Sequence, residues 1–246
     1  MQVIRLAVTP PKDPMLPPDP TMIRDAEILS QLTDTIARFV RERLVPAEQH
    51  VAETDTIPDD IVADMKAMGL FGLSIPEQYG GLGLTMEEEV LVAFELGRTS
   101  PAFRSLMGTN NGIGAQGILI DGTEEQKQKY VPALATGEVI GAFCLTEPDV
   151  GSDSGAVKTR AQREGDHYIL NGTKRYITNG PHAGLFTVMA RTDPEIQGGG
   201  GVTAFIVEGD TPGISRGKAD VKMGQKGAHT CDCLLYTSDA ADDLFR

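Results

Sequence analysis

Two short segments contain the residues of this chain whose types best suit ligand binding. The first, FCLTEPDVGSD, covers Phe143–Asp153, and the second, YITNG, covers Tyr176–Gly180. Both combine hydroxyl side chains with glycine, so hydroxyl groups and exposed backbone N–H groups can meet the same ligand. At the mouth of a sheet, these donors suit a large, flat, electron-poor ring and its pyrophosphate tail. The same residue types are common in turns, so either segment taken alone is more simply a turn.

The bulk composition excludes several other classes of function. The chain has 246 residues, a net charge of −13 and 40% hydrophobic residues, which is ordinary for a soluble globular protein. No cluster of Lys or Arg is long enough to follow a phosphate backbone, so we expect no nucleic-acid partner. No apolar run approaches the ~20 residues of a membrane span. The proline-dense N-terminus is not typical of a secretory signal, and a transit peptide has little support.

The chain has three cysteines, Cys144, Cys231 and Cys233. An odd number without a framework spacing indicates a reducing compartment, and we predict a cytoplasmic protein. Cys231 and Cys233 could form a metal pair, but no second pair completes four ligands, so we predict no metal site. Cys144 is interpreted as a small buried hydrophobe. His182 and His229 are single loop histidines with no partner pattern in the sequence, so surface or satisfied positions are expected.

The first half of the chain has a helical pattern. Apolar residues recur at three- and four-residue steps over 28–44, with Pro20 at a first helical position and Pro46 at the end of this helix. A second helix is expected from Asp59-Asp60 to the stop signal Gly69. Three further helix starts are predicted, at Thr85 with Glu88, at Ser100-Pro101 and at Thr123 with Gln126.

The pattern changes to that of strands near Gly141. Val157, Thr159 and Ala161 alternate with polar residues, and Glu164-Gly165-Asp166 is expected to turn the chain. Asn171-Gly172 predicts a two-residue hairpin. Two buried strands are expected at Leu185–Ala190 and Val202–Val207, separated by a flexible loop at Gly198–Gly201. A run of helices followed by a run of strands predicts an α+β fold or separate domains, not a Rossmann alternation.

Two further segments complete a family resemblance: PEQYGGLGL at Pro76–Leu84 and KMGQKGAHT at Lys222–Thr230. With all four segments in this order, the chain resembles the acyl-CoA dehydrogenase family. The resemblance implies an N-terminal all-helical bundle domain at 21–140, after a poorly ordered proline-rich leader at 1–20. An antiparallel β-barrel-like middle domain is expected at 141–233. The family's C-terminal four-helix domain is expected to be absent from these 246 residues. Pro76–Leu84 is expected to be a tight loop that closes the helical domain.

The resemblance also implies which residues hold the cofactor, FAD. Thr146 would bond the pyrimidine edge of the flavin, and Ser152 would reach the pyrophosphate or the acyl-CoA substrate. Tyr176 stands where many members of the family have Trp, and Phe143 stands where Tyr is frequent, so the packing around the flavin is expected to differ. The expected cofactor contacts are Phe143, Leu145, Thr146, Gly151, Ser152, Tyr176, Ile177 and Thr178.

The implied activity is α,β-dehydrogenation of an acyl-CoA thioester, a reaction of fatty acid and lipid metabolism. In this family a carboxylate removes the α-proton, and the β-hydride passes to flavin N5. Electrons then pass to an electron-transfer flavoprotein, and the full-length protein is expected to be a homo-oligomer. The catalytic carboxylate belongs to the C-terminal domain, so Glu147 is interpreted as a turn or structural carboxylate. The alternatives are an acyl-CoA oxidase-like flavoprotein and a non-catalytic flavin- or acyl-binding module.

The last residues differ from the rest of the chain. Residues 234–246 resemble translated sequencing-adapter sequence, so we expect an artefact that truncates the protein, although a genuine helix capped by Ser238 is the alternative. A truncated chain would be inactive alone. It would also expose apolar faces, aggregate readily and bind flavin weakly.

Overall fold

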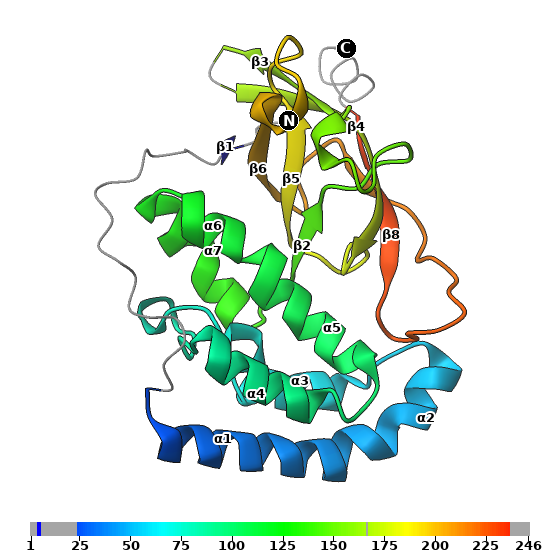
Figure 1. The fold of residues 1–246 in the computed structure, drawn as a ribbon. Coiled ribbons are helices and arrows are strands. Elements are labelled where there is room, and N and C mark those ends of the chain that lie inside the picture. The colour runs from blue at the N-terminus through cyan, green and yellow to red at the C-terminus, as the bar shows by residue number, and fades with distance from the viewer. Residues whose placement is uncertain (1–3, 6–23, 166, 237–246) are drawn as a thin grey trace.

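The computed structural model describes residues 4–5, 24–165 and 167–236. Helices from the first half form one layer, and a curled sheet from the second half stands against it (Figure 1). This order, helices first and strands second, confirms the predicted α+β class. Within these described residues, no helix is long and apolar enough to cross a membrane.

The first predicted helix begins later and continues further than expected. Asp25 caps α1 (Ala26–Phe39), and Pro20 lies outside the described residues. Pro46 does not end the helix: a π turn at Val40–Leu44 leads directly into α2 (Val45–Thr54). In a regular α-helix the Pro46 ring would collide with a carbonyl four residues earlier, and the wider π turn accommodates it.

The other predicted helix starts are confirmed: three of them have a side-chain cap, and the helix at Asp59-Asp60 has two acidic residues in its first turn without such a cap. Thr85 with Glu88 and Thr123 with Gln126 both form complete capping boxes. Ser100 accepts a hydrogen bond from the N–H of Ala102. The corresponding helices are α3 (Asp59–Ala67), α4 (Met86–Leu96), α5 (Pro101–Thr109) and α7 (Glu124–Ala135). A further short helix, α6 (Gln116–Asp121), was not predicted.

The sheet has the order β1-β6-β5-β3-β4-β8-β7, with β2 also paired to β5. Most neighbours are antiparallel, but β2 and β3 run parallel to β5, so the expectation of an antiparallel sheet holds only in part. Both buried strands predicted on either side of Gly198–Gly201 are confirmed. The strands are β1 (Ile4–Arg5), β2 (Gly141–Cys144), β3 (Arg160–Glu164), β4 (His167–Thr178), β5 (Leu185–Arg191), β6 (Val202–Glu208), β7 (Ile214–Arg216) and β8 (Thr230–Leu235).

The hairpin predicted at Asn171-Gly172 is wrong. Both residues lie inside β4, where Asn171 pairs with Arg160 and Gly172 pairs with Leu235. The chain turns earlier, at Gly165, whose φ is 63°. Gly172 is required for close approach instead, because a Cβ there would collide with Thr159. Gly172 is therefore explained by its close contact with Thr159 and not by a local turn.

The predicted ends of the middle domain and of the leader also need adjustment. Strand β8 continues through Leu234 and Leu235, past the predicted boundary at 233. Ile4–Arg5 of the predicted leader form β1, which pairs antiparallel with β6. The rest of that leader and residues 237–246, which contain the capped-helix alternative, lie outside the described residues.

Three clusters of buried side chains hold the fold together. One lies among the helices and includes Ala228 from the loop before β8. A second fills the inside of the curled sheet. The third joins the two layers, because Leu185 and Ile206 of the sheet pack with helical residues such as Ile118 and Leu134. The helical and sheet portions therefore share a core.

Candidate functional site

The two segments selected from the sequence lie side by side in the structure. The backbone N–H of Arg175, in β4, donates to the carbonyl of Thr146, which follows β2, at 2.8 Å. After Thr146 the chain makes a tight turn in which Glu147 and Val150 exchange two backbone hydrogen bonds. That turn leads directly to Gly151 and Ser152. Residues far apart in the sequence thus form one rim beside β4.

A β-bulge shapes the second segment. Lys174 pairs with Cys233 and Ile177 pairs with Cys231, so β4 has one extra residue between these pairs. The extra residue lets both Lys174 and Ile177 point inward, while Tyr176 is 59% exposed. Tyr176 has a φ of 58°, a left-handed conformation that is uncommon for an aromatic residue. Such backbone strain is frequent at ligand sites.

Three hydroxyl groups on the rim are available to a ligand. In the described part of the chain, the side chains of Thr146, Ser152 and Thr178 make no hydrogen bond, and the backbone N–H groups of Gly151 and Ser152 have no acceptor. A Cβ added at Gly151 would meet nothing within 4 Å, so the space beside it is open. This set of neutral donors and acceptors fits the polar edge of a flavin and a pyrophosphate.

The remaining predicted contacts have different surroundings. The Ile177 side chain is only 2% exposed and belongs to the sheet core, so it could offer a ligand only its backbone. Phe143 lies half-buried on β2, opposite Thr187 of β5. The carbonyl of Leu145 is already occupied, because it accepts a hydrogen bond from Lys174 at 3.1 Å. The rim itself is formed by Thr146, Gly151, Ser152, Tyr176 and Thr178.

A buried ion pair that was not predicted from the sequence lies directly behind this rim. Lys174 Nζ lies 2.8 Å from Glu147 Oε1, and the two side chains are 0% and 3% exposed. Glu147 also accepts from the backbone N–H groups of Lys158 and Thr159, at 2.7 and 2.9 Å. Its interpretation as a structural carboxylate agrees with these contacts. A lysine at an inward position of a strand is the only signal that could have suggested the pair.

The two partners respond to burial in different ways. Burial alone would raise the pKa of Glu147, but the hydrogen bonds from Lys174, Thr159 and Lys158 outweigh it and hold the pKa below its ordinary value. Burial lowers the pKa of Lys174, and the contact with Glu147 opposes that shift. Glu147 is therefore a charged acceptor, with both of its oxygens in use.

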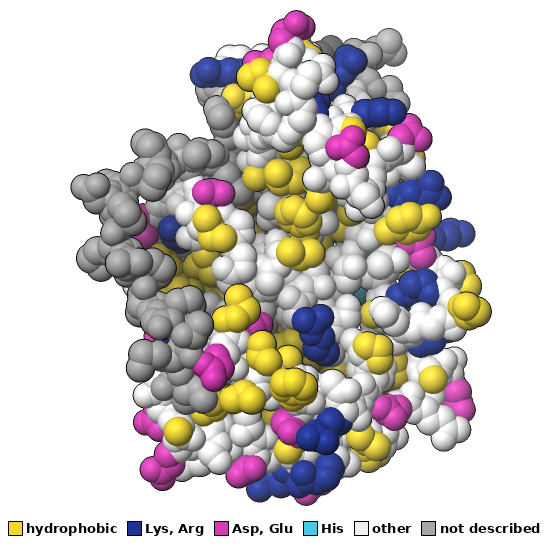
Figure 2. Space-filling model, viewed as in Figure 1, with side chains coloured by type: hydrophobic (Ala, Val, Ile, Leu, Met, Phe, Trp, Pro, Cys, Tyr) yellow, Lys and Arg dark blue, Asp and Glu magenta, His cyan; other side chains and the backbone are white. Residues whose placement is uncertain are grey.

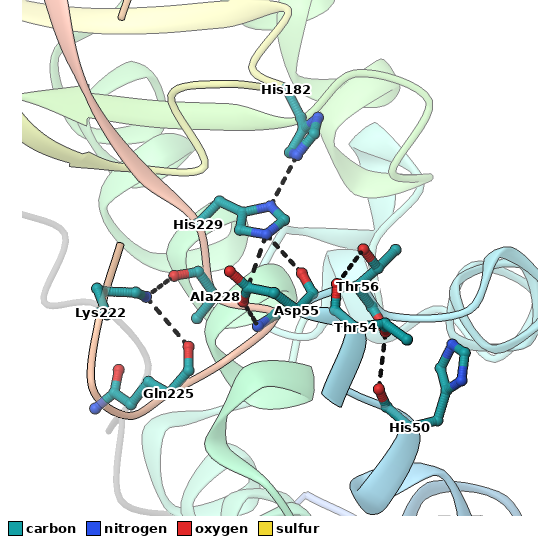
Figure 3. Close-up of polar contacts among 10 residues, drawn as sticks. His50, Thr54, Asp55, Thr56, His182, Lys222, Gln225, Ala228 and His229 are labelled. Atoms are coloured by element: carbon teal, nitrogen blue, oxygen red, sulfur yellow. Dashed lines mark hydrogen bonds and ion pairs between the residues drawn. The ribbon is translucent and has the colours of Figure 1, made fainter. Parts of the chain in front are cut away.

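His182 and His229 are satisfied loop histidines, and each is part of the other's hydrogen bonding. Nε2 of His182 lies 3.0 Å from Nδ1 of His229, and Nε2 of His229 lies 2.7 Å from the carbonyl oxygen of Asp55 (Figure 3). Asp55 ends α2 with a φ of 57° and accepts from the N–H of Gly227. These contacts join the loop after β4, the loop before β8 and the end of α2. The residues that form these contacts are far apart in the sequence, so no local pattern predicts the contacts.

The other two family-like segments form close contacts within the helical layer. In Pro76–Leu84, the N–H groups of Leu82 and Leu84 donate to Gly72 and Leu73, so the segment folds back as the expected tight loop. In Lys222–Thr230, Lys222 donates to the carbonyl of Ala228 (Figure 3). A Cβ at Gly227, whose φ is 83°, would lie 2.7 Å from a methyl group of Val51. This second loop therefore presses against the helices.

The three cysteines are free and buried. A hydrogen bond to Cys144, together with burial, raises the pKa of Cys233 to about 12, and the pKa of Cys231 is raised as well. The thiols of Cys231 and Cys233 are therefore poor nucleophiles at neutral pH. The described residues contain no group of three or more His, Cys, Asp or Glu side chains that could hold a metal ion.

Residues 27–138 match the N-terminal domain of acyl-CoA dehydrogenases, and residues 142–236 match their middle domain. The chain belongs to the acyl-CoA dehydrogenase family. The two matches meet where the structure changes from helices to strands, and the second extends through the end of β8. No match to the C-terminal domain of the family was found.

Two curated relatives illustrate the similarity. An acyl-CoA dehydrogenase of Bacillus subtilis (strain 168) is 39% identical over 204 residues, which cover 83% of this chain and 54% of the relative. The mitochondrial isovaleryl-CoA dehydrogenase of Pongo abelii is 38% identical over 224 residues, which cover 90% of this chain and 53% of the relative. The chain thus spans about half the length of these relatives.

Several solved structures have a similar fold. The acyl-CoA dehydrogenase of Bacillus anthracis complexed with FAD has a TM-score of 0.77 and 34% identity, covering 89% of this chain and 37% of that one. A structure reported with the electron transferring flavoprotein of Acidaminococcus fermentans has a TM-score of 0.81 and 36% identity, covering 87% and 57% of the chains. A prolyl acyl carrier protein oxidase has a TM-score of 0.80 and 32% identity, also covering 87% and 57%.

Proposed function

We propose that this chain forms the N-terminal and middle domains of an FAD-dependent dehydrogenase that oxidises an acyl-CoA thioester at its α and β carbons. Membership in the acyl-CoA dehydrogenase family supports this class of reaction. The observation that carries the cofactor assignment is the rim formed after β2 and at the end of β4. Its hydroxyls on Thr146, Ser152 and Thr178 make no hydrogen bond within the described residues.

Each rim residue has a proposed part in binding FAD. Thr146 and Thr178 would hydrogen-bond the polar edge of the flavin ring from two neighbouring segments. The N–H groups of Gly151 and Ser152 would meet the pyrophosphate, and the exposed Tyr176 ring would cover part of the flavin. When bound, FAD supplies the acceptor for the hydride that leaves the β carbon. The protein residues orient the two reactants and exclude water.

We propose that the carboxylate base comes from a C-terminal domain, as the resemblance implies. Glu147 cannot act as this base, because it is 3% exposed and both of its oxygens accept hydrogen bonds. The chain of 246 residues would then be inactive alone. An electron-transfer flavoprotein is the proposed electron acceptor, which the neighbour from Acidaminococcus fermentans supports. A homo-oligomeric, cytoplasmic full-length protein is part of the same proposal.

Purification of the full-length protein tests this proposal directly. We expect a yellow protein that releases one FAD per chain on denaturation. Anaerobic addition of an acyl-CoA should bleach the flavin absorbance, and an electron-transfer flavoprotein should restore it. A colourless protein that gains no absorbance when it is incubated with FAD would contradict the cofactor assignment. A yellow protein that no acyl-CoA bleaches would contradict the reaction.

An oxidase is the second candidate, because the prolyl acyl carrier protein oxidase has the same fold. In an oxidase the reduced flavin would pass its electrons to oxygen. Turnover in air should then release one hydrogen peroxide per thioester oxidised, without an electron-transfer flavoprotein. A dehydrogenase should give little peroxide and should require the protein acceptor.

A further inference from the structure

The ion pair between Lys174 and Glu147 takes no part in the proposed reaction, yet it lies immediately behind the rim. Both side chains are almost completely buried, and Lys174 Nζ makes a second hydrogen bond to the carbonyl of Leu145 at 3.1 Å. Glu147 completes its shell with the N–H groups of Lys158 and Thr159. The pair therefore connects three segments: the loop after β2, the chain entering β3, and β4.

Stability alone does not account for such a pair. Removing two charges from water costs several kcal/mol per ion, roughly what their attraction returns, and apolar pairs of similar volume are often as stable. In some proteins a buried, hydrogen-bonded pair contributes to conformational specificity instead, because its bonds restrict the positions of the segments that they join. The contacts of Lys174 restrict the loop after β2 relative to β4.

The residue most directly restricted is Thr146. It lies between Leu145, whose carbonyl accepts from Lys174, and Glu147, whose carboxylate contacts the same ammonium group. Its own carbonyl accepts from the N–H of Arg175, the residue after Lys174. Three consecutive residues of the loop are thus attached to two consecutive residues of β4. The Thr146 hydroxyl lies on this anchored stretch and is left free of intramolecular bonds in the described residues.

We propose that Lys174 is a positioning residue for the FAD site: through the Leu145 carbonyl and Glu147 it holds the Thr146 hydroxyl in the place where the flavin is bound. This inference rests on the proposed function. Lys174 is not proposed to touch the cofactor. It acts by fixing the distance between the loop after β2 and the bulge of β4.

Two double variants of the full-length protein separate the effect of the hydrogen bonds of Lys174 from the effect of its charge. Lys174→Met alone would leave Glu147 buried without a cation and is expected to destabilise the fold. Lys174→Met with Glu147→Gln removes both charges and the donor to Leu145. Lys174→Gln with Glu147→Gln removes the same charges but supplies an amide donor in place of the ammonium. Urea unfolding of the apoproteins verifies that each variant is folded.

The readout is the FAD dissociation constant of the apoprotein, measured by flavin fluorescence. We expect the Met-containing double variant to bind FAD about tenfold more weakly or worse, and the Gln-containing one to recover part of that loss. Thr146→Ala should weaken binding in the wild type but add little in the Met-containing background, where the hydroxyl is already misplaced. The visible absorbance of bound flavin should shift in the same variants.

Lys129→Met is the matched control. Lys129 of α7 forms a similar ion pair with Glu208 of β6 at 2.9 Å, but both side chains are exposed and neither segment belongs to the rim, so FAD binding should not change. Equal FAD affinity in the wild type and the folded Met-containing variant would overturn the inference. An equal effect of Thr146→Ala in both backgrounds would overturn it too. A wild-type protein that binds no FAD would overturn the proposed function itself, which is a different result.

Discussion

Thr146 and Thr178 are the residues on which the cofactor assignment depends most. Both are half-buried at the rim, and neither hydroxyl is used by the rest of the described protein. A hydroxyl without an internal partner can be removed without leaving an unsatisfied group behind. Substitution by alanine should therefore reveal ligand binding rather than folding.

We expect Thr146→Ala and Thr178→Ala each to weaken FAD binding by about two- to tenfold in the full-length protein, the loss of one hydrogen bond. Urea unfolding of the apoprotein should be unchanged. Fluorescence titration with FAD measures the effect, and Thr35→Ala on the surface of α1 is the control, because its hydroxyl bonds only within the helix. Wild-type affinity in both rim variants would count against the site.

The sequence indicated the two segments of the rim but not the residues behind them. Hydroxyls and glycines in these segments, together with the family resemblance, led to the rim residues, whose part in binding FAD stays a prediction. Lys174 and Glu147 were not paired beforehand, because 27 positions separate them and only the folded sheet brings them together. The same reason hid the contact of His182 with His229, which lie 47 positions apart.

At the scale of elements, local signals succeeded where the interaction itself is local. Thr85 and Thr123 predicted helix starts correctly because each capping box is complete within four residues. Pro46 did not end its helix, because a π turn accommodates the proline ring. Asn171-Gly172 did not form a turn, because Gly172 lies within a strand in close contact with Thr159. The parallel pairing of β2 with β5 also depends on tertiary packing, which a single sequence does not encode in any short pattern.

The histidine contact between loops predicts a dependence of stability on pH. Burial lowers the pKa of His182 below its ordinary 6.5, and His229 and Arg216 lower it further. The unfolded chain then binds the proton more readily than the folded one, so stability should decline as pH falls below about 6.5 and should not depend on this group above it. Urea unfolding between about pH 5 and pH 8 measures the slope.

His182→Gln should flatten that slope, because the amide cannot be protonated in this range. His50→Gln is the matched control: His50 is exposed on α2, and its carbonyl, not its ring, accepts the hydrogen bond from Thr54 (Figure 3). A wild-type slope in the His182→Gln protein would show that the contact between the two rings does not sense protonation.

At the scale of the whole molecule, apolar side chains reach the surface over both layers (Figure 2). Ile28 of α1 and Met86 and Phe94 of α4 are 64%, 70% and 67% exposed. Leu29 and Phe94 line one shallow groove between these helices. Exposed apolar groups of this kind favour association, whereas the net charge of −13 opposes it.

We therefore expect the 246-residue chain to self-associate as its concentration rises, and more strongly at about 0.5 M salt, where the repulsion is screened. Phe94→Gln should weaken this association. Light scattering coupled to size-exclusion chromatography gives the mass. A monomer at every concentration and salt level would refute the expectation.

The core shared between layers has a thermodynamic consequence. Leu185 and Ile206 are buried against side chains of α6 and α7, so unfolding of either half would expose apolar surface of the other half to water. The helices and the sheet should consequently unfold together in one cooperative transition. Calorimetry of the chain should give a single endotherm whose van't Hoff and calorimetric enthalpies agree, and two resolved endotherms would mean that each half is autonomous.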